Sequence, residues 1–183
     1  MIAAEEPLTH VAYVYDGTPE GLLTAVFQAY ANHEDPEDIA RESSFQPRLG
    51  QSVRTIESDA KLAERVKRGL VRTTGKAGFN AVLHASLSDD AQAGTVVYRF
   101  IRYAMRADVR QAAIGEIAHP AVAPLVALDR SVMNERHYLQ QFLRFERLEG
   151  NVWVARCSPK ASVVPLLMGW FSARFNDVPF MIY

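Results

Sequence analysis

Hydrophobic and polar positions follow helical or strand periodicity along most of this chain. Residues 11–15 (VAYVY) are β-branched or aromatic, which predicts a strand. Apolar residues then recur at helical spacing as far as residue 32, behind Thr18 as an amino-terminal cap and Pro19 in the first turn. The same periodicity predicts further helices over residues 59–72, 76–86, 88–105, 109–117, 120–142 and 162–175.

The last third of the chain predicts two more strands and an end strand. Residues 142–148 and 152–157 alternate with period two around Glu149, Gly150 and Asn151, a combination typical of a β-hairpin. Residues 179–183 (PFMIY) predict a final strand. Strands at both ends and helices between them predict an α+β fold. We expect an antiparallel sheet of about four strands, including hairpin 142–157 and the end strands, packed with about six helices.

Length and composition indicate one globular domain. The chain has 183 residues, of which 49% are hydrophobic and 22% are charged, so it can bury a core of ordinary size. We therefore predict a single domain over residues 1–183. Because the chain stops inside a predicted strand, we expect this domain to be the amino-terminal part of a longer protein.

The ends and the single thiol predict a cytoplasmic protein. The first ten residues lack the basic and apolar regions of a signal peptide. No apolar run approaches the roughly 20 residues that a membrane helix needs, so no membrane contact is expected. Cys157 has no partner for an internal disulfide, which fits a reducing compartment and a small buried thiol.

Basic residues recur on two of the predicted helices although the net charge is only −1. Four of them are spaced four, three and four residues apart and therefore share one helical face, and two more lie three apart on a later helix. Such a face can follow nucleic-acid phosphates. It can equally be an ordinary solvated face, supported by an ion pair between Glu64 and Arg68. The candidate phosphate contacts are Lys61, Arg65, Arg68, Arg72, Arg99 and Arg102.

Glu135 interrupts the apolar seam of the predicted helix 120–142. A carboxylate at a core position needs a partner, because burying an unpaired charge is costly. One interpretation is a structural ion pair with Arg174, or failing that with Arg144. The other is a catalytic acid/base, with His137 as a helper and the two arginines as anion-binding groups. Both arginines are also candidate nucleic-acid contacts.

Sequence motifs for metals and cofactors are absent. The chain has no HExxH, CxxC, GxGxxG, GxxxxGK[ST] or GxSxG motif. Glu135 and His137 are two residues apart, which is the wrong spacing for two ligands on one helix face. We therefore predict neither a metal site nor a cofactor.

Five segments, taken together and in this order, resemble a bacterial family known as the "probable DNA metabolism protein" family. They are residues 13–30 (YVYDGTPEGLLTAVFQAY), 61–70 (KLAERVKRGL), 135–159 (ERHYLQQFLRFERLEGNVWVARCSP), 163–175 (VVPLLMGWFSARF) and 179–183 (PFMIY). None of these motifs has known chemistry. Tyr138 stands where the family pattern usually has a basic residue.

The resemblance implies a role in DNA repair by association. In that family the domain stands alone or precedes a module of the uracil-DNA glycosylase superfamily, and it is associated with a radical-SAM protein. Three hypotheses follow: a non-catalytic module that binds DNA or positions such a partner, an enzyme acting on DNA or nucleotides through Glu135, and a pure protein-interaction module. The first is favoured, because the arginine stripes suit phosphate contacts and no glycosylase or iron–sulfur motif is present.

Overall fold

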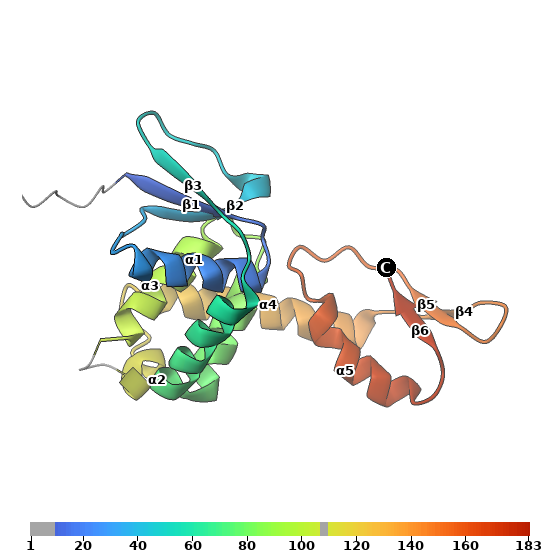
Figure 1. The fold of residues 1–183 in the computed structure, drawn as a ribbon. Coiled ribbons are helices and arrows are strands. Elements are labelled where there is room, and N and C mark those ends of the chain that lie inside the picture. The colour runs from blue at the N-terminus through green and yellow to red at the C-terminus, as the bar shows by residue number, and fades with distance from the viewer. Residues whose placement is uncertain (1–9, 107–109) are drawn as a thin grey trace, which may run out of the picture.

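The protein consists of two units joined by one long helix (Figure 1). The structure is a computed structural model that describes residues 10–106 and 110–183. Residues 1–9, on which the targeting prediction depends, and Val109, the expected start of one helix, lie outside the described residues.

A three-stranded parallel sheet forms the top of the first unit. Its central strand is β1 (Val11–Tyr15), flanked by β2 (Asp38–Arg41) and β3 (Ser52–Ile56). The helix α1 (Pro19–Ala31) connects β1 to β2. A helical crossover returns the chain in its original direction, which is why β2 runs parallel to β1. Thr18 caps α1 through its hydroxyl oxygen, as predicted.

Helices fill the space beneath this sheet. The helix α2 (Ala60–Ser86) bends at Gly75, whose φ of 72° is non-helical, so the two helices predicted over residues 59–72 and 76–86 are two arms of one bent element. It is followed by α3 (Ala93–Ala104). Two short 3₁₀ helices, Glu42–Ser44 and Arg110–Gly115, complete this unit.

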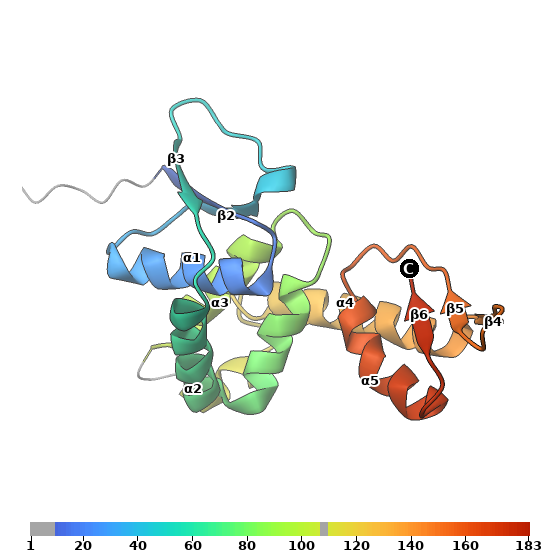
Figure 2. The ribbon, with the colours of Figure 1, turned by 45° about the vertical axis from the view of Figure 1, so that its right-hand side comes forward.

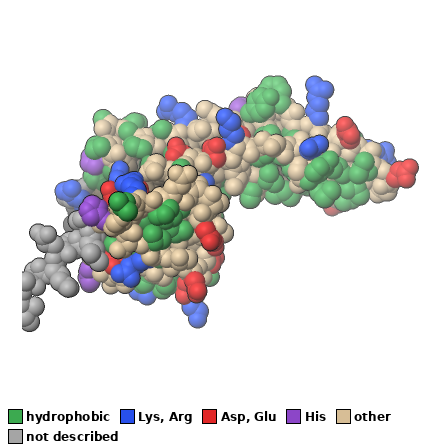
Figure 3. All heavy atoms as spheres, turned by 90° about the horizontal axis from the view of Figure 1, so that it is seen from above, with side chains coloured by type: hydrophobic (Ala, Val, Ile, Leu, Met, Phe, Trp, Pro, Cys, Tyr) green, Lys and Arg blue, Asp and Glu red, His purple; other side chains and the backbone are tan. Residues whose placement is uncertain are grey.

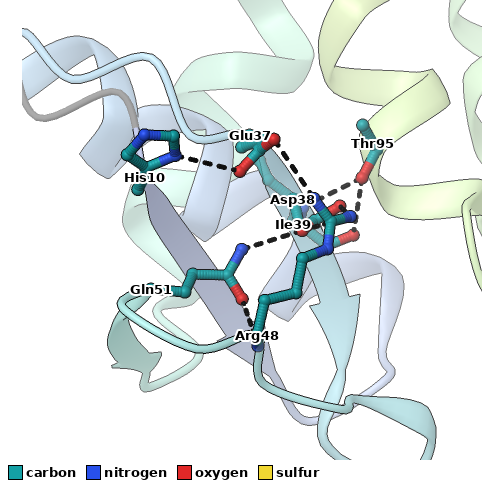
Figure 4. Close-up of polar contacts among 7 residues, drawn as sticks. All are labelled: His10, Glu37, Asp38, Ile39, Arg48, Gln51 and Thr95. Atoms are coloured by element: carbon teal, nitrogen blue, oxygen red, sulfur yellow. Dashed lines mark hydrogen bonds and ion pairs between the residues drawn. The ribbon is translucent and has the colours of Figure 1, made fainter.

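The outer edge of β2 is closed by α3. The hydroxyl of Thr95 accepts a hydrogen bond from the Ile39 amide at 3.0 Å and donates to the Ile39 carbonyl at 3.4 Å (Figure 4). Both groups point away from β1 and would otherwise be buried without partners. Gly94 makes this approach possible, because a Cβ there would lie 2.3 Å from the Ile39 oxygen. The helix therefore protects an open strand edge.

The second unit contains a mixed three-stranded sheet. The long helix α4 (Ala123–Phe142) leads into β4 (Glu146–Arg147), which pairs antiparallel with β5 (Trp153–Ala155). The helix α5 (Val164–Phe175) then connects β5 to β6 (Phe180–Ile182), and β6 runs parallel to β5.

The α+β class is confirmed, but the predicted antiparallel sheet of four strands is wrong. The two end strands belong to different sheets, and the first sheet is entirely parallel. The reason is that each sheet contains a strand–helix–strand crossover, through α1 or α5, and such a crossover favours parallel pairing. The described residues form five α-helices rather than about six, since the arms of α2 are continuous.

The long helix α4 contributes to both hydrophobic cores (Figure 2). Leu125, near its start, belongs to the first core with the residues of β1 and α1. Val132 and Leu139 belong to the second core, which includes Leu167 and Phe171 of α5. No helix within the described ranges is both long and apolar enough to span a membrane.

We predict that Thr95→Val lowers the free energy of unfolding by about 1–3 kcal/mol, the typical cost of leaving a buried polar group unpaired. The substitution keeps the side-chain shape and removes only the hydroxyl. Urea unfolding followed by circular dichroism measures the change, and the exposed Thr55→Val on β3 is the matched control. Equal stability of the two variants would contradict the role assigned to Thr95.

Candidate nucleic-acid interface

The four basic side chains predicted on α2 lie on the surface and are free of carboxylates. Lys61, Arg65, Arg68 and Arg72 are all exposed. Among the described residues, no ion pair joins any of them to an acidic side chain. Their positive charge is therefore available to a ligand; we call this set the α2 stripe.

Two contacts define the surroundings of the α2 stripe. The predicted Glu64–Arg68 ion pair is wrong, because Glu64 binds Lys67 instead, at 3.1 Å. The guanidinium of Arg65 lies over the ring of Phe27 in α1, 4.7 Å from its centroid. This stacking holds Arg65 at the boundary of α1 and α2 while leaving it exposed to solvent.

The second predicted pair of basic residues is placed differently. Arg102 forms an ion pair with Asp35 at 2.7 Å and donates a hydrogen bond to the hydroxyl of Tyr98 at 3.2 Å. Burial raises the pKa of Tyr98 to about 12, so this phenol stays neutral. Arg99 is exposed and lines a cavity of about 480 Å³ beside Arg102. Arg102 thus braces the loop before β2, which makes it a weaker phosphate contact than the α2 stripe.

The amino-terminal edge of the parallel sheet carries a network of opposite charges (Figure 4). Arg48 binds Glu37 and Asp38, each at 3.1 Å. Gln51 donates to Asp38 at 2.9 Å, and His10 lies 3.6 Å from Glu37. Because the cation is matched by two carboxylates, this network links the strand starts and offers little net charge to an anion.

Glu135 is half-buried and binds backbone amides rather than an arginine. One carboxylate oxygen accepts from the amide of Lys160 at 2.7 Å and the other accepts from the amide of Ala161 at 2.9 Å. The expected ion pair with Arg174 or Arg144 is wrong, since neither forms an ion pair with Glu135 in the described structure. The carboxylate instead fastens the loop before α5 to the middle of α4.

His137, the second candidate catalytic residue, points elsewhere. Its side chain is exposed, and its Nε2 accepts a hydrogen bond from the side-chain Nε2 of Gln141, one turn later in the helix, at 2.8 Å. It does not line the cleft beside Glu135. The helix therefore separates the two candidates, as their spacing of two residues requires.

Two neighbouring clefts lie in the second unit and share one wall. The Glu135 cleft has a volume of about 430 Å³, and the Trp153 cleft has a volume of about 510 Å³. Phe142, Leu143 and Arg144 line both. The Glu135 cleft is also lined by Arg156 and Cys157, and the Trp153 cleft by Gln141 and Arg174.

The predicted residues Arg144 and Arg174 are brought together in the Trp153 cleft, among aromatic rings. The ring of Trp153 lies 5.9 Å from that of Phe175, and both line this cleft. No site role was predicted from the sequence for Arg156, Phe142 or Tyr138, which line the Glu135 cleft.

The clefts do not suit nucleophilic or metal chemistry. Burial raises the pKa of the Cys157 thiol, which keeps it protonated and a poor nucleophile. Within the described part of the chain, no group of three histidine, cysteine or acidic residues is placed to hold a metal ion.

The fold and the site define an α+β protein that has a basic face on one helix and two clefts lined by arginine and aromatic side chains. Residues 91–183 match the model of the family described as a domain of unknown function, DUF4130, and since this is just over half of the chain, the protein belongs to that family. No curated protein and no solved structure matches it. Both clefts lie inside the matched segment, whereas the α2 stripe precedes it.

We predict that Glu135→Gln destabilises the second unit by about 1–3 kcal/mol. A glutamine keeps one acceptor but turns its NH₂ group toward the second amide, so one of the two amides loses its charged hydrogen-bond acceptor. Hydrogen exchange of the Lys160 and Ala161 amides should accelerate, while Glu149→Gln in the exposed hairpin turn leaves both rates unchanged. Unchanged exchange in Glu135→Gln would contradict the anchoring role.

Proposed function

We propose that this protein is a non-catalytic module that binds nucleic acid, with DNA as its partner. The observation that carries the proposal is the α2 stripe, whose four exposed cations have no carboxylate partners among the described residues. Lys61 and Arg72 are eleven residues apart, which corresponds to about 16 Å along a helix. Each strand of a duplex has one phosphate per roughly 3.4 Å of the duplex axis, so this length corresponds to about five phosphates of one strand when measured along that axis.

The resemblance to the DNA metabolism family supports DNA repair as the setting. In this proposal the module binds DNA and positions a uracil-DNA glycosylase-like domain or a radical-SAM protein on it. Catalysis belongs to that partner, because Glu135 uses both oxygens to hold backbone amides and His137 lies outside the cleft.

A second candidate function is docking of a protein partner by the second unit. Seven of the eleven large hydrophobic side chains exposed in the described residues lie there, between Tyr138 and Tyr183. Exposed apolar groups gathered in one region are typical of interaction sites. The enzyme hypothesis has no comparable support.

We predict that the double substitution Arg65→Glu with Arg68→Glu weakens binding to a 20-base-pair duplex by about tenfold or more at low salt. Losing two phosphate contacts should also reduce the slope of log affinity against log salt by roughly 0.9 per contact. Fluorescence anisotropy from 50 to 200 mM salt measures both.

The matched control is Arg130→Glu with Arg147→Glu, two exposed positions on α4 and β4 that make the same change in charge. We expect this control to bind the duplex more tightly than the α2 variant. If the wild-type protein does not bind the duplex at about 50 mM salt, where phosphate contacts are strong, the proposed function is wrong.

A further inference from the structure

The second unit presents arginines and aromatic rings together. Figure 3 shows hydrophobic side chains gathered over the carboxy-terminal arm, with basic side chains beside them. Arg144, Arg156 and Arg174 are exposed, and none of the three pairs with a carboxylate among the described residues. The one acidic group that lines either cleft, Glu135, already accepts two amide hydrogen bonds.

The aromatic rings of this surface have open faces or edges. The side chains of Phe142 and Tyr138 are each 60% exposed, and their ring centroids are 4.8 Å apart. Trp170 is 40% exposed, and the guanidinium of Arg174 lies 5.7 Å from its ring centroid. In a hydrophobic core these rings would be buried. In a purely apolar docking surface they would not alternate with arginines that lack carboxylate partners.

The two clefts are neighbours on the surface. Because Phe142, Leu143 and Arg144 line both, these residues form the wall that the clefts share, which we call the ridge. Each volume lies within the usual range for sites that enclose small ligands, about 300–1,000 Å³. A flat ring that enters either cleft meets an aromatic side chain and a guanidinium together.

We propose that these two clefts bind unstacked bases of a single-stranded nucleic acid. The strand crosses the ridge, with one base in each cleft, Phe142 between them, and Arg144 and Arg174 on the phosphates. Open bases stack on aromatic rings and phosphates bind arginines, whereas a duplex keeps its base faces covered. This inference rests on the proposed function and deepens it by naming the strand form and the site.

The test measures anisotropy of the whole protein with a labelled eight-nucleotide deoxythymidine strand and, separately, with the 20-base-pair duplex. Tryptophan fluorescence should fall when the strand binds, because Trp153 lines one of the clefts. Phe142→Ala should weaken strand binding by roughly five- to a hundredfold, the effect of losing one base stack. Phe142→Leu should weaken it as well, since it keeps an apolar side chain but removes the ring.

A second comparison tests the role of charge with Arg144→Glu and Arg147→Glu. The two substitutions make the same change in charge, but Arg147 lines neither cleft. We expect Arg144→Glu to weaken strand binding and Arg147→Glu to leave it close to wild type. We expect the α2 double variant to lose more affinity for the duplex than for the strand. We expect the Phe142 variants to lose more affinity for the strand than for the duplex. Phe142 is exposed, so its replacement leaves the fold intact.

Two outcomes would overturn the inference. If the wild-type protein binds the duplex and the Phe142 and Arg144 variants bind the strand as wild type does, the strand site is wrong while the proposed function stands. The exposed rings would then be assigned to a protein partner. If the wild-type protein binds neither strand nor duplex, both proposals fail.

Discussion

One helix, α4, connects the two units of this protein and packs into the hydrophobic core of each. The helix α4 has 20 residues, or about 30 Å at 1.5 Å per residue, and its two ends belong to different cores. Two polar contacts brace it and its surroundings: His84 of α2 binds Asp129 at 2.6 Å, and the amide of Ser162 donates to the carbonyl of Leu87 at 2.8 Å. Because α4 contributes side chains to both cores, it connects the unit that carries the α2 stripe to the unit that carries the two clefts.

The helices were predictable from the sequence because their cause is local. Apolar spacing and capping residues such as Thr18 act within one or two turns, so they are visible in a window of a few residues. Sheet pairing is not local. No strand was predicted from the sequence over β2, whose first residue, Asp38, is charged; the structure leaves this residue only 9% exposed, since Arg48 and Gln51 bind its carboxylate. Those partners follow ten and thirteen residues later.

The candidate site was predictable only in part, for a related reason. Glu135 was singled out by its place in an apolar seam, but its partners are backbone amides. Every residue except proline has a backbone N–H group, so no particular side chain identifies in the sequence which amides bind Glu135. An arginine was the expected partner because side-chain charges are the visible ones. The clefts were missed because they join the end of α4 and the segment after it to β5, the loop that follows β5, and α5, a meeting that depends on tertiary packing.

The two proposed surfaces use different physics, and this difference matters for what the module can do. Cations on α2 attract any phosphate backbone, and their effect weakens as the salt concentration rises, because the release of counterions from the DNA then becomes less favourable. Stacking on Phe142 and Trp153 depends on uncovered base faces and responds much less to salt. A protein with both surfaces can be held near any DNA by the first and select opened strands by the second. Enzymes that modify bases act on single strands or extrude the target base from the duplex, so a module with this selectivity suits a partner that acts on unstacked bases.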